Sequence, residues 1–169
     1  LFWRAPGLQP NTVLITNELP LDYETDLSFT APINWMYGSN YADSHLAYGM
    51  IFSTIRLGRT LPALQPNIPI YIGIRGANFY GSTSQAVVIY MPKDGCLRIM
   101  DPALGDQLTY ASLSPNLVNA IPLSDPSRIM VNANSEMGIP FLTEPEHQWC
   151  YYYTKAELAR QKNEWQEII

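Results

Sequence analysis

Two short apolar segments joined by a turn constrain the fold of this chain more than any other feature. Ala86–Met91 is apolar or aromatic at every position, which is typical of a strand covered on both faces. The turn at 92–95, Pro-Lys-Asp-Gly, is favoured because proline presets φ and glycine accepts a positive φ. Cys96–Met100 supplies a partner strand that ends before Asp101. The sequence therefore predicts a central β-hairpin.

Further strands and helices are expected around this hairpin. Thr12–Thr16 is short and β-branched, and the isoleucines of 70–74 alternate with other residues, so both segments predict strands. Asp43–Leu57 carries a wide apolar stripe between a capping aspartate and a glycine, which predicts a helix. Residues 17–32 are polar and proline-containing, and a loop is expected there. Ser114 followed by proline predicts the start of a short helix.

The end of the sequence predicts a helix of its own. Trp149–Tyr153 is aromatic and resembles a strand, whereas Thr154 and Glu157 form a capping box that starts a helix. The apolar stripe of that helix reaches the last residue without a stop signal. We therefore expect residues 154–169 to be a truncated C-terminal helix that begins a tetratricopeptide-like segment.

The expected fold class is α/β or α+β. Residues 1–153 are long enough for a single globular domain. The prediction is a mixed β-sheet built around the central hairpin, with helices packed against it and the C-terminal helix at its end.

Composition excludes several classes of protein. Charged residues make up only 15% of the chain, but 11 Tyr and 4 Trp provide the burial that disordered chains lack. The net charge of −5 and the scattered basic residues argue against a nucleic-acid partner. No apolar run approaches the roughly 20 residues that a membrane-spanning helix needs.

Acidic and histidine residues offer a weak metal site. Asp22, Glu24 and Asp26 alternate, so an extended chain would point their carboxylates toward one hard cation. His147 follows two glutamates, and His45 is the only other histidine. Neither an EF-hand loop nor an HExxH spacing is present, so solvated loops are the favoured interpretation. A metal-dependent or hydrolytic enzyme would need these groups to converge; no catalytic residue and no cofactor is predicted.

A set of aromatic residues forms a candidate binding surface, because such rings can stack on sugars or on a partner protein. Its members are Trp35, Tyr37, Tyr41, Tyr48, Trp149 and Tyr151. Filling the core and its rim is the more common role of such residues.

Two cysteines, Cys96 and Cys150, complete the candidates. Their spacing allows either two buried thiols or one disulfide, which would close a loop of about 50 residues. Spacing alone does not decide between these, because it does not show whether the Cβ atoms meet. Two cysteines are too few for a structural zinc site.

Five segments together carry a family resemblance: Trp3–Leu8, Ala31–Trp35, Cys96–Pro102, Glu144–Tyr152 and Lys155–Gln161. They resemble the extracytoplasmic C-terminal domains of large multi-pass membrane proteins of filamentous green bacteria and their relatives. The membrane portions of such proteins resemble lipid-linked-sugar glycosyltransferases of the mannosyltransferase type.

This resemblance implies a compartment and a role. Both cysteines lie in matching segments, so it implies a disulfide in an oxidising, periplasmic or cell-surface compartment. It also implies a non-catalytic accessory domain, membrane-associated through other segments, that positions a glycan acceptor or partner for a membrane-embedded glycosyltransferase. The expected partners are the membrane-embedded portion of the same protein or a neighbouring membrane protein, and a glycan. The alternative is a structural or interaction module of a cell-surface or membrane assembly.

Overall fold

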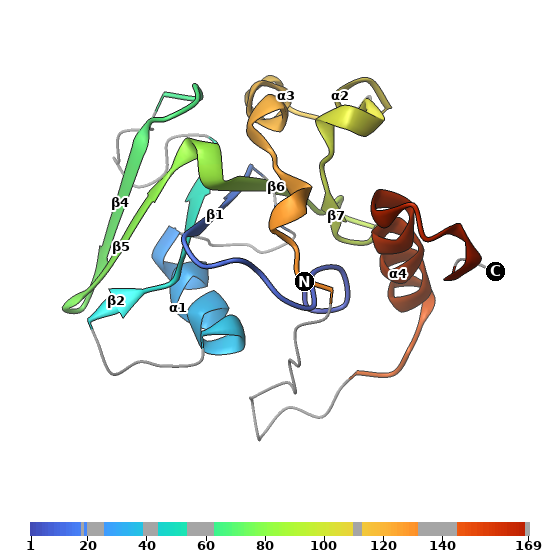
Figure 1. Ribbon diagram of the computed structural model, residues 1–169, viewed down its shortest axis with the longest axis horizontal. Helices are drawn as coiled ribbons and strands as arrows, with labels where there is room; N and C mark the ends of the chain where they lie inside the picture. Colours follow the sequence, from blue (N-terminus) through green and yellow to red (C-terminus); the bar gives the residue numbers. More distant parts are fainter. Residues whose placement is uncertain are drawn as a thin grey trace.

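Two β-sheets form the centre of this chain in the computed structural model (Figure 1). The structure describes residues 1–17, 19, 26–38, 44–53, 63–109, 113–131 and 145–167. The strands are β1 (Thr12–Thr16), β2 (His45–Leu46), β3 (Tyr48–Phe52), β4 (Pro69–Ile74), β5 (Ala77–Ser82), β6 (Ala86–Tyr90) and β7 (Arg98–Ile99). The larger sheet has the order β3-β1-β6-β7 and the smaller the order β2-β5-β4.

The described residues also form four α-helices and five 3-10 turns. The α-helices are α1 (Asp26–Tyr37), α2 (Asp106–Thr109), α3 (Pro115–Ala120) and α4 (Trp149–Lys162). The 3-10 turns are η1 (Thr83–Gln85), η2 (Pro102–Leu104), η3 (Ile121–Leu123), η4 (Pro126–Arg128) and η5 (Trp165–Glu167). In the part of the chain that the structure describes, no helix has both the length and the apolar character needed to cross a bilayer.

The larger sheet is buried on both faces, which confirms the prediction for the strand that begins at Ala86. The face toward the smaller sheet holds Val13, Ile15, Ile51 and Val88, packed with Ile70, Ile72, Phe79, Leu117 and Ile121. The opposite face holds Leu14, Met50, Val87 and Ile89, packed with Leu8, Ile33, Ile129 and Leu158. Strand β1 pairs in parallel with β3 and β6, while β6 pairs antiparallel with β7. The fold is therefore α+β with mixed sheets, as expected.

The central hairpin forms with a different turn geometry from the one expected. Ile89 pairs with Ile99, and the Gly95 N–H donates to the Pro92 carbonyl at 3.1 Å. Among the described glycines, positive φ occurs at Gly76 and Gly105, not at Gly95. A Cβ at Gly95 would lie 2.5 Å from Pro92 Cγ, so this glycine is required by close packing rather than by a left-handed backbone.

The helix predicted for residues 43–57 is wrong, because residues 45–46 and 48–52 are strands β2 and β3. Every residue of β3 is buried, and a continuous apolar run fits a helical stripe as well as a buried strand. Gly49 marks the difference: a Cβ there would lie 2.5 Å from the Phe79 ring of β5. Residue 43 and residues 54–57 lie outside the described residues.

The loop expected at residues 17–32 is also corrected, since residues 26–32 belong to α1. Pro32 lies on the exposed side of α1, where solvent can reach the backbone that its ring leaves unbonded. Side chains on the buried side of α1 bind the free backbone N–H groups along the outer edge of β3. Asn34 Oδ1 accepts the Tyr48 N–H at 3.0 Å, and Thr30 Oγ1 accepts the Met50 N–H at 3.2 Å. An edge strand is thereby covered, which prevents it from pairing with other chains.

The C-terminal helix begins earlier and ends earlier than predicted. It starts at Trp149, so the strand expected at 149–153 and the capping box at Thr154 are both wrong. The Thr154 hydroxyl donates to the Cys150 carbonyl at 2.7 Å from inside the helix. Asn163 adopts a left-handed conformation (φ 58°) and ends α4, so the predicted stripe does not continue as one helix through Trp165. Residues 168–169 lie outside the described residues, and the division of the chain at residue 154 stays a prediction.

Candidate functional site

A disulfide joins the two cysteines, and it anchors one end of α4 to the central hairpin. Cys96 follows the hairpin turn and Cys150 lies in the first turn of α4, with their Cα atoms 5.2 Å apart. The bond that the resemblance implied is present. Disulfides are typical of proteins outside the cytoplasm, where the redox environment allows them to persist.

An aromatic group lies at the start of α4, and we call it the α4 surface: Trp3, His147, Trp149, Tyr151 and Tyr152. The His147 ring stacks on the Tyr151 ring, with centroids 3.6 Å apart and planes at 5°. Trp3 contacts the Tyr151 ring edge-on at 5.3 Å. Trp149 and Tyr152 are 72% and 62% exposed. Two members of the predicted aromatic set, Trp149 and Tyr151, therefore lie in the first turn of α4, where Tyr151 contacts Trp3 and His147 and Trp149 contacts Tyr153.

Charged side chains border the α4 surface. Lys155 Nζ lies 6.0 Å from the Tyr151 ring centroid, and the Arg98 guanidinium lies 5.2 Å from the Tyr153 ring centroid. Glu146 and Lys155 are both exposed. Exposed aromatic rings with polar and charged residues at their edge fit the aromatic core and polar rim of a protein interface.

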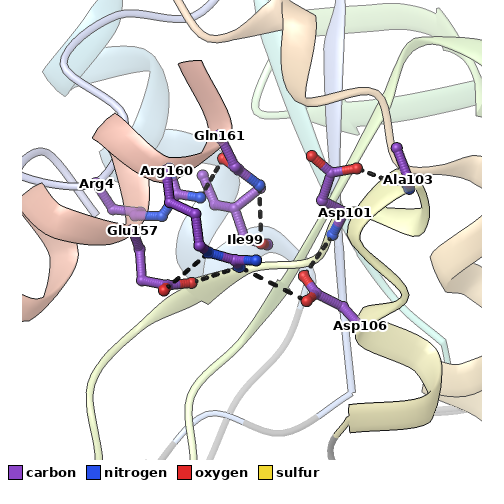
Figure 2. Close-up of polar contacts among 8 residues, drawn as sticks. All are labelled: Arg4, Ile99, Asp101, Ala103, Asp106, Glu157, Arg160 and Gln161. Atoms are coloured by element: carbon purple, nitrogen blue, oxygen red, sulfur yellow. Dashed lines mark hydrogen bonds and ion pairs between the residues drawn. The ribbon is translucent and has the colours of Figure 1, made fainter. Parts of the chain in front are cut away.

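A buried polar cluster lies beneath the opposite end of α4 (Figure 2). The Arg160 guanidinium donates to both carboxylate oxygens of Glu157, at 3.1 and 2.8 Å, and lies 3.7 Å from Asp106 Oδ1. Asp106 Oδ2 accepts the Asp101 N–H at 2.8 Å. Burial raises the pKa of Asp106, although that hydrogen bond and Arg160 oppose the effect. The cluster thus connects α4 to the segment that follows β7.

Arg4 completes this cluster from the N-terminal segment. Its side chain is fully buried, and its Nη2 donates to Gln161 Oε1, while Gln161 Nε2 donates to the Ile99 carbonyl at 3.3 Å (Figure 2). Burial lowers the pKa of Arg4 to about 10, with Glu157 acting in the opposite direction. Within the described residues, Arg4 Nε and Nη1 have no hydrogen-bond partner. The contact between α4 and the rest of the chain is therefore unusually polar.

Three members of the predicted aromatic set lie elsewhere. The Tyr37 hydroxyl donates to the Ala5 carbonyl at 2.7 Å, and the Tyr48 hydroxyl donates to the Leu8 carbonyl at 2.9 Å. Burial raises the pKa of both phenols. These two tyrosines hold the N-terminal segment against α1 and β3. Trp35 is 59% exposed on α1, and Tyr41 lies outside the described residues.

A second aromatic group lies on the outer face of the smaller sheet, and we call it the aromatic platform: His45, Tyr71, Asn78 and Tyr80. Tyr71 and Tyr80 pair directly across β4 and β5, with ring centroids 5.2 Å apart, and are 62% and 58% exposed. The His45 ring is parallel to the Tyr80 ring within 4°, at 6.4 Å. The Tyr71 hydroxyl donates to Asn78 Oδ1 at 2.7 Å.

Sequence reasoning missed the platform, although part of its signal was present. Isoleucines at 70, 72 and 74 place Tyr71 on the outward face of a half-buried strand. The partner Tyr80 follows only from the register of β4 with β5, and His45 only from the pairing of β2 with β5.

The two histidines among the metal and hydrolase candidates lie apart. His45 contacts Tyr80 on the smaller sheet, whereas His147 contacts Tyr151 beside α4. Figure 1 shows β2 and α4 on opposite sides of the molecule. Asp22 and Glu24 lie outside the described residues, and Asp26 opens α1. Among the residues that the structure describes, no three His, Cys, Asp or Glu side chains are grouped so that they could hold a metal ion.

Comparison with family models, with curated proteins and with solved structures found no match to this chain.

Proposed function

We propose that this chain is a non-catalytic accessory domain that works outside the cytoplasm, in the periplasm or at the cell surface. It belongs to, or docks on, a multi-pass membrane protein of glycosyltransferase-like type, and it positions a glycan acceptor or partner for that protein. The α4 surface is the observation that carries this proposal.

The composition of the α4 surface suits a partner near a membrane. Tryptophan and tyrosine combine a large apolar ring with a polar group, and they are enriched both at protein interfaces and at the membrane–water boundary. Trp149 and Tyr152 present most of their ring area to solvent. The Cys96–Cys150 bond holds them in place before any partner binds, which reduces the entropy lost on binding.

The location of the matching segments adds support. Trp3 contacts Tyr151, Arg4 contacts Gln161, and Cys96 is bonded to Cys150. Four of the segments that carry the family resemblance therefore meet at α4, namely Trp3–Leu8, Cys96–Pro102, Glu144–Tyr152 and Lys155–Gln161. These contacts hold α4 against the N-terminal segment and the central hairpin, and so keep the α4 surface in place.

Site-specific photo-crosslinking in intact cells tests the proposal. A photoreactive amino acid replaces Trp149 or Tyr152 in the full-length protein, and a matched control carries it at Trp35, which is similarly exposed on α1. We expect crosslinks from positions 149 and 152, and not from 35, to a multi-pass membrane protein or to the membrane-embedded portion of the same chain.

Two results would contradict the proposal. Crosslinks confined to soluble cytoplasmic proteins would contradict the proposed location outside the cytoplasm. Equal crosslinking from the control position 35 would show that the α4 surface has no special role in docking. Crosslinks to another cell-surface protein without glycosyltransferase-like membrane spans would support the alternative, a structural module of a surface assembly.

A further inference from the structure

We infer that the aromatic platform is a binding site for a neutral hexopyranose chain, separate from the α4 surface. The inference deepens the proposed function, on which its biological role rests, by assigning the glycan to the smaller sheet. The binding step itself requires only this chain.

The platform presents aromatic rings in the manner that sugar stacking needs. The face of an aromatic ring is electronegative and attracts the weakly positive C–H groups on the face of a pyranose. A Cβ at Gly73 would lie 3.0 Å from the Tyr71 hydroxyl, so the Tyr71 side chain extends along β4 over Gly73 rather than outward into solvent. A ring that lies along the sheet exposes its face, and Tyr71 is 62% exposed.

The rings form a row long enough for more than one sugar. Tyr71 and Tyr80 are neighbours at 5.2 Å, and His45 lies beyond Tyr80 at 6.4 Å. The row crosses all the strands of the smaller sheet, because these residues belong to β4, β5 and β2. An extended oligosaccharide laid across the strands would contact successive rings.

Polar groups beside the rings can bind sugar hydroxyls. Asn78 Oδ1 accepts from Tyr71, which fixes the amide and leaves its Nδ2 as a donor. Neither Asn78 Nδ2 nor the Tyr80 hydroxyl has a hydrogen bond to any other described residue. A few fixed polar groups among apolar rings provide orientation and specificity in small-molecule sites.

The charge of the platform selects a neutral ligand. Strands β2, β4 and β5 contain no Asp, Glu, Lys or Arg. No Lys or Arg on the strands themselves can hold a uronate, sulfate or phosphate group, and Arg75 is confined to the turn that joins β4 to β5. The chain as a whole carries a net charge of −5, which disfavours anions. The α4 surface differs in this respect, because Lys155 and Arg98 border it.

The platform rests on a rigid base. The Phe79 ring lies on the other face of β5, fully buried, and it fills the space left by Gly49 and Gly81. Rings held on a packed sheet lose little freedom when a ligand binds, which favours affinity. A cross-strand tyrosine pair also stabilises the hairpin, so the test must separate binding from stability.

Isothermal titration calorimetry of the purified chain tests the inference. The probes are neutral tetrasaccharides of gluco, manno and galacto configuration and one tetrasaccharide of uronic acids. We expect saturable binding of at least one neutral probe and none of the uronate. Tyr71→Leu and Tyr80→Leu, which keep apolar area but remove the ring, should each weaken binding about tenfold. Trp165→Leu, at a similarly exposed tryptophan outside both aromatic surfaces, should leave it unchanged.

Two further variants keep the test independent of folding. Gly73→Ala retains every aromatic ring but places a methyl group against the Tyr71 hydroxyl, and it should weaken binding several-fold. Tyr80→Phe retains the ring and should have a smaller effect than Tyr80→Leu. The unfolding midpoint of each variant shows whether the chain still folds with its ordinary stability.

Several outcomes overturn the inference. They are the absence of binding to any neutral probe, tighter binding of the uronate, binding that survives both Tyr71→Leu and Tyr80→Leu, and binding that is lost in Trp165→Leu. These results are independent of the crosslinking result at positions 149 and 152. Failure of the platform is therefore distinguishable from failure of the proposed docking role.

Discussion

The two aromatic surfaces of this protein rest on different foundations. The aromatic platform lies on a ladder of paired residues along β4 and β5, above a fully buried phenylalanine. The α4 surface lies on a helix whose buried residues are Thr154, Leu158 and Ala159, held by one disulfide and a buried polar cluster. Figure 1 shows the β4–β5 hairpin and α4 at opposite ends of the long axis.

This difference shows how a chain of few charges can hold exposed aromatic residues in place in two ways. Apolar packing beneath the platform fixes the rings whatever the redox state. The α4 surface depends on a covalent bond that forms only in an oxidising compartment. We therefore expect the platform to be the more robust of the two when the disulfide is removed.

The largest effect is expected beneath the platform. Phe79→Ala removes a fully buried ring and should lower the free energy of unfolding by about 3–5 kcal/mol. Tyr80→Ala is the matched control, since Tyr80 is the next residue and lies on the exposed face; it should cost no more than about 1 kcal/mol. Urea unfolding measures both. Equal decreases in the free energy of unfolding for the two variants would contradict a platform supported by buried packing of Phe79.

A smaller effect is expected from the disulfide. Replacing Cys96 and Cys150 together by serine should lower the free energy of unfolding by about 2–4 kcal/mol, because the crosslink restrains the unfolded chain. Hydrogen exchange should accelerate in α4 and stay unchanged in β4 and β5. Equal acceleration in both regions would show that α4 belongs to the same cooperative unit as the smaller sheet. It would contradict the expectation that only the α4 surface depends on the disulfide.

The smallest effect is expected in the polar cluster. Burial raises the pKa of Asp106, so the folded state binds its proton more tightly than the unfolded state. Ionising this carboxyl therefore lowers the free energy of unfolding at neutral pH. That loss disappears as the pH falls through the raised pKa. Asp106→Asn keeps an acceptor for the Asp101 N–H and should raise the free energy of unfolding by no more than about 1 kcal/mol near neutral pH.

The pH dependence checks the sign of that effect. The difference between Asp106→Asn and the unchanged chain should shrink toward the ordinary carboxyl pKa of about 3.9. Urea unfolding at neutral pH and near pH 3.9 measures this difference, with Asp94→Asn, at an exposed position, as control. A loss of several kcal/mol near neutral pH would mean that the Arg160–Asp106 pair outweighs the burial of the carboxylate.

The sequence predicted the elements whose signal is local. Ile70, Ile72 and Ile74 alternate, and the run from Ala86 is apolar throughout, so β4 and β6 follow from short-range pattern. Ser114 caps α3 as expected, accepting the Leu117 N–H at 3.4 Å. The disulfide followed from the family resemblance, because spacing alone left both alternatives open.

The remaining elements depend on contacts between distant residues. Gly49 reads as a weak helix residue until Phe79, which is far along the chain, is known to pack on it. The prolines of residues 17–32 suggested a loop. The hydrogen bonds of Thr30 and Asn34 to β3, which hold α1 in place, could not be known from this segment alone. The platform likewise needs the register of two strand pairs. Such pairings are set by the whole fold, which a short segment does not encode.

The most direct test of the two-surface account is a map of backbone amide chemical shifts during titration with a neutral tetrasaccharide. We expect shifts at His45 and along β4 and β5, centred on Tyr71, Asn78 and Tyr80, with α4 unaffected. Shifts centred on Trp149–Tyr152, or no shifts at the platform at saturating saccharide, would contradict it.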